Sequence, residues 1–177
     1  MTDHFAHGKR SLVLLGTGTS MRRAPWKDEA CQFWGPAYLW GKVPRLDVGF
    51  ELHDKDLCLA DNTWDSVRAC PVPLYMQRYS DEVQSSRVYP LDAVRAAFTP
   101  PGRVKPFLTN NSSYMLAFAL LQDPRPEAIS LFGVDMVHGT EYGAQRPSCE
   151  FFLGVWWGLQ IPLHIDPVSA LRKTPFL

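Results

Sequence analysis

An apolar run that ends in a glycine-rich turn is the feature that most restricts the fold of this chain. Ser11–Leu15 has the length and apolar character of a buried β-strand, and Gly16-Thr17-Gly18-Thr19-Ser20 follows it directly. Glycine lets backbone N–H groups approach an anion, and the hydroxyl groups of threonine and serine add donors. The segment therefore predicts a phosphate-binding turn, with an ordinary strand-ending turn as the alternative. It lacks the third glycine of a dinucleotide-binding loop and the lysine of a Walker loop.

Further apolar segments alternate with loops and with segments of helical length, as in a parallel sheet covered by helices. The most apolar of them, Ala128–Val134, ends at Asp135 and has the character of a central strand buried on both faces. The sequence thus predicts an α/β, Rossmann-like three-layer domain with a mainly parallel central sheet. The expected strands are Ser11–Gly16, Gln32–Gly35, Val48–His53, Pro73–Gln77, Arg87–Tyr89, Ala128–Val134 and Pro162–Ile165.

Two helices have defined starting signals. Asn110 or Asn111 is suited to cap an apolar helix that extends to Leu121, and Pro147 is suited to begin a helix that extends towards Gly158. Shorter helices are expected at Thr63–Ala69, Leu91–Phe98 and Ser169–Lys173.

Charge, cysteine content and hydropathy limit the class of protein further. The 18 basic and 18 acidic residues cancel, so no overall basic field favours nucleic acid, although a nucleic-acid acceptor stays open. The four cysteines form no Cys-x-x-Cys pair, which argues against zinc and favours reduced thiols in the cytoplasm. No apolar run approaches the roughly 20 residues that cross a bilayer, so we expect no membrane partner. We also expect no haem or flavin.

Residues 1–10 are polar and predict a mobile leader, and residues 11–177 predict a single domain. Two neighbouring tryptophans, Trp156 and Trp157, fit either the core or a subunit contact, which leaves an oligomer open. Trp26, Trp34, Trp40 and Tyr38 fit either stacking on a base or packing beneath a loop.

Short motifs lie along the chain from about Leu12 to Leu171. They are Gly16–Ser20, Ala24–Trp26, Trp34-Gly35, Phe50–His53, Tyr75–Gln77, Thr109–Ser112, Phe132–Met136 and Gly139–Tyr142. Together they resemble a group of small phage-encoded Rossmann-like proteins, which are distantly similar to MptE-like pterin diphosphokinases and family 42 sialyltransferases. The resemblance implies a nucleotide or nucleotide-sugar ligand and transfer of a glycosyl or phosphoryl-type group, in the host cytoplasm if the protein is phage-encoded. Thr19 stands where the enzymes' loop has proline.

A second set of residues is similar to a different enzyme class. Asp135, Gly139-Thr140, Glu150 and Gly158–Pro162 resemble the order of the sugar site in nucleoside deoxyribosyltransferases. This likeness implies N-glycosidic chemistry with Glu150 as the carboxylate nucleophile. A phage protein that sequesters a signalling nucleotide without chemistry is a third alternative.

Ligands of open parallel sheets bind beyond the carboxyl ends of the strands. A carboxylate at the exit of an apolar strand needs a cation, a metal or donor groups, so we predict Asp135 as a catalytic residue that holds Mg²⁺ or acts as a general base. Its alternative role is to cap the next turn. The start of the helix at Asn110 fits nucleoside or phosphate recognition, or a plain cap. The expected nucleotide-binding residues are Gly16, Thr17, Gly18, Thr19, Ser20, Gly35, Asn110, Asn111 and Ser112.

The segment His138–Arg146 combines an acid, a base, a phenol, an amide and a guanidinium, and its glycines would let it close as a lid. We predict His138 and Glu141 as catalytic residues; for His138 and Arg146 a surface position is the alternative. Glu51 and His53 share one face of a strand and can point into one cavity. The expected substrate-binding residues are Glu51, His53, Gln77, Tyr142, Gln145, Arg146 and Glu150.

Overall fold

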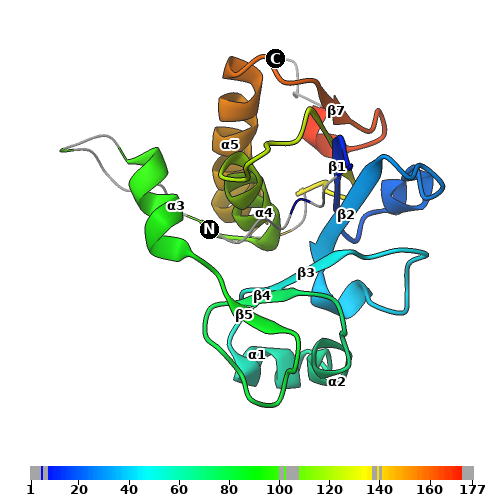
Figure 1. The fold of residues 1–177 in the computed structure, drawn as a ribbon, viewed down its shortest axis with the longest axis vertical. Coiled ribbons are helices and arrows are strands. Elements are labelled where there is room, and N and C mark those ends of the chain that lie inside the picture. Colours follow the sequence, from blue (N-terminus) through cyan, green and yellow to red (C-terminus); the bar gives the residue numbers. More distant parts are fainter. Residues whose placement is uncertain are drawn as a thin grey trace.

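A parallel sheet of seven strands forms the centre of the computed structural model (Figure 1). The structure describes Phe5, residues 8–99, Gly102, residues 108–136, Gly139 and residues 141–172, without the side chains of Glu141 and Tyr142. The strand order is β5-β4-β3-β2-β1-β6-β7, and all neighbouring strands are parallel. The strands are β1 (Ser11–Leu15), β2 (Cys31–Pro36), β3 (Val48–Glu51), β4 (Leu74–Met76), β5 (Ser86–Val88), β6 (Ala128–Phe132) and β7 (Leu163–Ile165).

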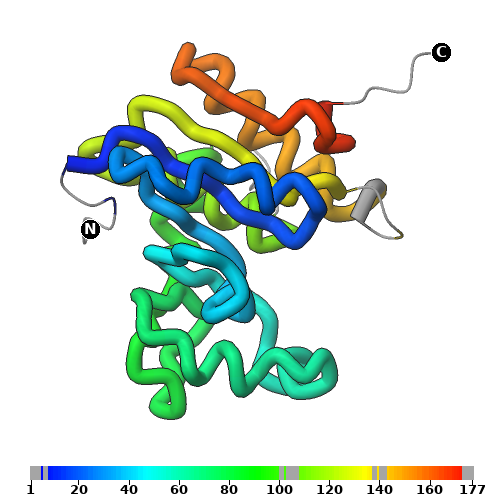
Figure 2. Tube along the Cα trace, turned by 90° about the vertical axis from the view of Figure 1, so that its right-hand side faces the viewer, coloured from blue at the N-terminus to red at the C-terminus, as the bar shows by residue number. Residues whose placement is uncertain are grey.

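Helices cover both faces of the sheet because successive side chains of a strand point to opposite faces. Leu12 and Leu14 of β1 belong to one hydrophobic core, and Val13 and Leu15 belong to the other. The first face is covered by α3 (Leu91–Phe98), α4 (Asn111–Leu120) and α5 (Arg146–Gly158); the second is covered by α1 (Lys55–Ala60), α2 (Trp64–Arg68) and the 3₁₀ helices η1 (Thr19–Arg23) and η2 (Ala37–Leu39). Figure 2 shows the same arrangement from the side. The predicted Rossmann-like α/β fold is confirmed.

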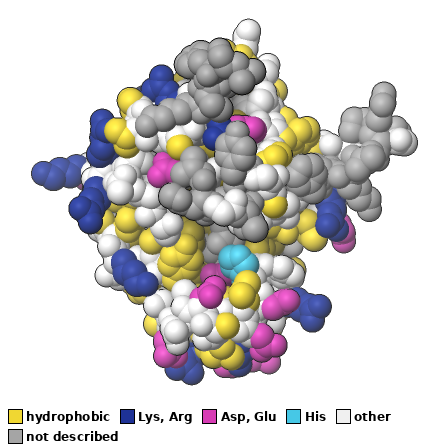
Figure 3. Space-filling view, turned by 180° about the vertical axis from the view of Figure 1, so that it is seen from behind, with side chains coloured by type: hydrophobic (Ala, Val, Ile, Leu, Met, Phe, Trp, Pro, Cys, Tyr) yellow, Lys and Arg dark blue, Asp and Glu magenta, His cyan; other side chains and the backbone are white. Residues whose placement is uncertain are grey.

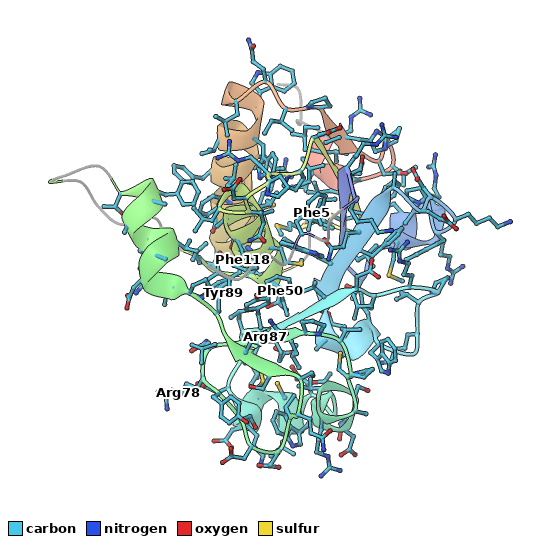
Figure 4. The ribbon with its side chains drawn as sticks, viewed as in Figure 1. Phe5, Phe50, Arg78, Arg87, Tyr89 and Phe118 are labelled. Carbon is cyan, nitrogen blue, oxygen red and sulfur yellow. The ribbon has the colours of Figure 1, made fainter. Side chains whose placement is uncertain are left out.

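An aromatic cluster attaches α4 to the sheet. The ring centroid of Phe50 lies 5.5 Å from that of Trp34, 5.3 Å from that of Tyr75 and 6.1 Å from that of Phe118. The Phe118 ring also lies 5.7 Å from the ring of Tyr89. In Figure 4 the side chains of Phe50, Tyr89 and Phe118 converge between β3 and α4. These large buried rings fix the position of α4, and therefore the position of its first turn at the edge of the sheet.

All the predicted strands are present, most of them within one residue of the expected ends, but β6 and β3 end two residues earlier than expected. β6 ends at Phe132 instead of Val134 because Gly133 has a φ of 74°, which turns the chain out of the sheet. β3 ends at Glu51 instead of His53, and the backbone N–H of His53 donates to the Glu51 carboxylate. Both early ends bring polar side chains to the carboxyl edge of the sheet.

Three helical segments differ from the sequence-based expectation. The sequence does not predict α1, whose six residues are too few to show a helical period and bury only Cys58. A π-helical turn, Glu141–Gln145, leads directly into α5 where a loop is expected. The last predicted helix, Ser169–Lys173, contains a single 3₁₀ turn at Ala170–Arg172, and residue 173 lies outside the described residues. The helices expected at Thr63–Ala69 and Leu91–Phe98 are present as α2 and α3.

The described residues before β1 contact the sheet. Phe5 is buried in the first core, and the Arg10 backbone pairs with the carbonyl of Ala30 and the N–H of Glu127. Residues 1–4, 6 and 7 lie outside the described part, and the mobile leader stays a prediction.

The two neighbouring tryptophans of α5 have opposite surroundings. Trp156 is fully buried and its indole N–H donates to the Leu116 carbonyl at 3.2 Å, whereas Trp157 is 74% exposed. Trp156 therefore belongs to the core and Trp157 to the surface. Neither α5 nor any other helix within the described ranges is long and apolar enough to cross a membrane.

Candidate functional site

The strand order creates a switch point between β1 and β6. The chain leaves β1 towards β2 on one side, and it returns to the other side of β1 only with β6. Connections diverge at such a point, so the carboxyl ends of the two strands leave a crevice that commonly binds ligands. The glycine-rich turn follows β1, and Asp135 follows β6. The predicted proximity of these two segments is therefore a direct consequence of the sheet topology.

Short hydrogen bonds hold the two strand ends together. The Gly16 N–H donates to the Phe132 carbonyl at 2.8 Å, and the Gly18 N–H donates to the Gly133 carbonyl at 2.8 Å. In return, the Gly133 N–H donates to the buried Ser20 hydroxyl at 2.6 Å. The N–H groups of Gly16 and Gly18 are thus engaged within the protein, and the turn offers a ligand its other groups.

The glycines of this turn are required by the close approach of the two strand ends. A Cβ atom on Gly16 would lie 2.2 Å from the Gly133 carbonyl oxygen, and a Cβ on Gly18 would lie 2.2 Å from Oδ2 of Asp135. Neither distance is compatible with a side chain unless the neighbour moves. The glycines therefore let the turn press against Asp135.

A polar cavity of about 240 Å³ opens between these strand ends and the first turn of α4. Its predicted members are Gly16, Thr17, His53, Asn110, Asn111, Ser112, Asp135 and Gln145. The remaining lining residues are Pro36, Tyr38, Thr109, Gly133, Val134 and Met136, none of which is among the expected binding residues, although Tyr38 is an aromatic candidate and Thr109, Gly133, Val134 and Met136 belong to the motifs named above. Figure 3, seen from behind Figure 1, shows a histidine beside acidic side chains in the middle of the surface, next to the residues drawn in grey.

Two buried oxygen atoms of this cavity have no hydrogen-bond partner among the described residues. They are Oδ1 of Asp135 and Oδ1 of Asn111. Buried polar atoms in native proteins nearly always have a partner, so both atoms point to a bound donor or cation. Met136, next in the chain, has a φ of 50°, a left-handed conformation that is uncommon for methionine and typical of functional sites.

The first turn of α4 supplies donors to the same cavity. Asn110 caps the helix: its side-chain oxygen accepts the Ser113 N–H at 2.9 Å, and its amide nitrogen donates to the Gln145 carbonyl at 2.9 Å. The backbone N–H groups that start a helix have no partner within the helix and carry partial positive charge. Asn111 and Ser112 occupy these positions and line the cavity.

Glu51 and His53 form a hydrogen-bonded pair at the end of β3. Oε1 of Glu51 lies 2.6 Å from Nδ1 of His53; the Glu51 side chain is buried, and the His53 side chain is half exposed. The hydrogen bond that His53 donates to Glu51 raises the pKa of His53, opposing the effect of burial, and the negative charges of Glu51 and Asp61 raise it further. His53 reaches the cavity, whereas Glu51 stays behind it.

Several predicted site residues lie away from the lining of the cavity. Arg146 bonds to Glu150 at 2.6 Å and to the carbonyls of Ala170 and Leu171 at 3.4 Å, so it connects α5 with the segment after β7. Gly35 packs against Leu15, Leu39 and Leu46 in the second core, and the side-chain amide of Gln77 donates to the Leu52 carbonyl. Thr19 and Ser20 are in η1, behind the turn. His138 lies outside the described residues, as do the side chains of Glu141 and Tyr142.

Comparisons with protein-family models, with curated proteins and with solved structures found no match to this chain. The fold and the site define its class: a Rossmann-like α/β protein with a polar cavity at the switch point of its sheet.

Proposed function

We propose that the cavity between β1, β6 and α4 binds a nucleotide or nucleotide sugar, and that the protein transfers a glycosyl or phosphoryl-type group from it to an acceptor. The observation that carries this proposal is the pair of unpartnered oxygens, Oδ1 of Asp135 and Oδ1 of Asn111, on residues that line the same cavity as the first turn of α4. Ribose hydroxyls and base amino groups satisfy such acceptors, and phosphate oxygens satisfy helix N–H groups.

The donor set also fits Mg²⁺. The described residues include no group of three or more His, Cys, Asp or Glu side chains able to hold a metal. Mg²⁺ is usually bound by one or two protein oxygens together with the phosphates of the substrate, and the Asp135 and Asn111 oxygens suit that mode. When bound, the ion would neutralise phosphate charge. All four cysteines are free and buried, which supports a reducing, cytoplasmic setting for this activity.

The alternative with Glu150 as nucleophile receives no support from the geometry of the described residues. Glu150 is exposed, pairs with Arg146 and does not line the cavity. A protein that only sequesters a nucleotide would use the same cavity. It would differ from a transferase in leaving the nucleotide unchanged.

The test is a panel of nucleoside mono-, di- and triphosphates and nucleotide sugars, incubated with Mg²⁺ and a mixture of hydroxyl acceptors and analysed by mass spectrometry. We expect one nucleotide class to be retained, and to be consumed only when acceptor is present. Asp135→Asn, which keeps the shape of the side chain, should retain the nucleotide and lose its consumption.

The matched control is Glu127→Gln, an exposed carboxylate just before the opposite end of β6, which should behave as the wild type. Retention of an unchanged ligand under all conditions would support sequestration instead. Release of free base that disappears in Glu150→Ala would support N-glycosidic chemistry, and failure to retain any member of the panel would overturn the proposal.

A further inference from the structure

A second cavity adjoins the first one and shares His53 with it. It has a volume of about 230 Å³ and lies between the start of α1 and the chain that leaves β4. Its lining is His53, Asp54, Lys55, Trp64, Met76, Gln77, Arg78, Tyr79 and Ser80. Because His53 lines both cavities, its imidazole lies where ligands in the two cavities would meet.

The Glu51 carboxylate determines which nitrogen of His53 is available. A carboxylate only accepts hydrogen bonds, so Nδ1, 2.6 Å from Glu51, carries the hydrogen of the neutral ring. Nε2, on the other side of the ring, then has the free lone pair. The half-exposed ring thus offers a base to its surroundings while a buried acid holds its orientation.

The second cavity combines aromatic rings with an available cation. Tyr79 is exposed and provides ring surface, on which the apolar faces of sugars stack, whereas the lining residue Trp64 is buried. Lys55 is already occupied, since it pairs with Glu82 and lies 5.1 Å above the Trp64 ring. Arg78 is exposed and has no ion-pair partner among residues 8–99 or the other described segments. Figure 4 shows Arg78 at the margin of the molecule, away from the aromatic core.

We propose that this second cavity is the acceptor subsite, that it takes a hydroxylated compound carrying a carboxylate or phosphate bound by Arg78, and that His53 is the catalytic base. The inference rests on the proposed group transfer. Nε2 of His53 takes the proton of the acceptor hydroxyl. The acceptor oxygen then forms a bond to the transferred carbon or phosphorus, the bond from that atom to the leaving phosphate oxygen breaks, and the nucleotide departs with that electron pair. The proton stays on His53, where Glu51 stabilises the cation as a positioning residue.

The charged groups around His53 determine the pH range in which it can act as a base. Glu51 and Asp61 favour the protonated ring, and Asp54, Lys55 and Arg78 share the second cavity with it. Asp135 shares the first cavity. The base form increases as the pH rises, so the rate should rise with pH through the pKa of His53, and Glu51→Gln should move that rise to lower pH.

The test follows the ring signals of His53 by NMR in protein labelled with ¹³C-histidine, with His53→Asn to assign them. Glucuronate and glycerol 3-phosphate serve as anionic probes, and glucose and glycerol as their neutral counterparts. We expect the anionic probes to shift the His53 signal at concentrations about tenfold lower than the neutral ones. Arg78→Ala should weaken the anionic probes about tenfold, whereas Arg87→Ala, an exposed arginine of β5 that does not line the cavity, should not.

Equal responses to charged and neutral probes, or an unchanged response in Arg78→Ala, would overturn the acceptor subsite. This result is separable from the proposed nucleotide site, because nucleotide retention and its dependence on Asp135 are measured without these probes. A pH–rate profile of nucleotide consumption that does not change in Glu51→Gln would overturn the role of His53 as base.

Discussion

Gly18 shows how a single methyl group can disturb the candidate site. Its φ of −66° suits alanine, so the conflict in Gly18→Ala is steric: the new Cβ would lie 2.2 Å from Oδ2 of Asp135 and 3.0 Å from the Gly133 carbonyl oxygen. The carboxylate must move into the cavity, and we expect nucleotide affinity to fall at least about tenfold, roughly 1.4 kcal/mol. Isothermal titration calorimetry measures the affinity, and urea unfolding should show a loss of about 1–3 kcal/mol.

The control for that prediction is Gly154→Ala in α5, where nothing lies within 4 Å of an added Cβ. Alanine favours the helix by about 0.8–1 kcal/mol over glycine, so this variant should gain stability and keep its affinity. If Gly18→Ala keeps the nucleotide affinity of the wild type, Asp135 does not contact the ligand.

The Glu51–His53 pair should make stability depend on pH. The hydrogen bond that His53 donates to Glu51 raises the pKa of His53, so the folded protein binds the proton more tightly than the unfolded chain does. The resulting stabilisation is complete below the unfolded pKa and is lost as the pH rises through the folded pKa. In Glu51→Gln we expect a lower pKa of His53 by NMR titration and a flatter dependence of the unfolding free energy on pH.

Glu82→Gln is the matched control, because Glu82 pairs with Lys55 on the surface and, among the described residues, no ion pair or hydrogen bond joins it to His53. Its His53 titration should equal that of the wild type. A His53 pKa that stays constant in Glu51→Gln would mean that the hydrogen bond to Glu51 does not hold the proton in solution.

Two neighbouring asparagines at the start of helix α4 have different roles. Asn110 caps the helix and also binds the Gln145 carbonyl, so Asn110→Ala should cost about 1–2 kcal/mol in urea unfolding. Asn111 faces the cavity with an unpartnered oxygen, and Asn111→Ala should change stability by less than about 0.5 kcal/mol while lowering nucleotide affinity. The pair serves as its own control: the reverse pattern would exchange the roles of the two residues.

The elements that the sequence predicts well are those whose pattern is local. β1 and β6 are largely apolar because both of their faces are covered, and α4 has a cap followed by an apolar body. The sequence does not predict α1 because its six mostly exposed residues show no helical pattern of apolar side chains. The exact ends of β3 and β6 depend on a side-chain hydrogen bond and on a positive φ angle, neither of which is visible in an apolar pattern.

At the scale of the whole molecule, the cysteines report on opening of the two cores. Burial raises the pKa of Cys31 and of Cys58 to about 11 and that of Cys149 to about 12, and it also raises the pKa of Cys70. Thiolate is the reactive form, so we expect iodoacetamide at pH 8 to leave the native protein unmodified and to alkylate all four thiols in urea. Intact-mass analysis measures this, and rapid labelling of the native protein would reveal an accessible thiol.

The sequence also predicts the meeting of the first glycine turn with Asp135, because parallel topology brings strand ends to one edge. The sequence does not predict the direction of a side chain where contacts with residues distant in the chain determine that direction. Arg146 and Glu150 have suitable chemistry but bind one another and the chain after β7. His53 and Gln77 both line the second cavity, but only His53 also lines the first, and this difference likewise depends on packing.

The neighbours of β1 have a consequence for biosynthesis. The central strand is made first, yet its partner β6 leaves the ribosome more than a hundred residues later. At about 5–20 residues per second, the edge of β1 that pairs with β6 waits for roughly 6–20 s. During translation this exposed strand edge is a natural substrate for chaperones, and the cavity can form only after Gln145 has emerged.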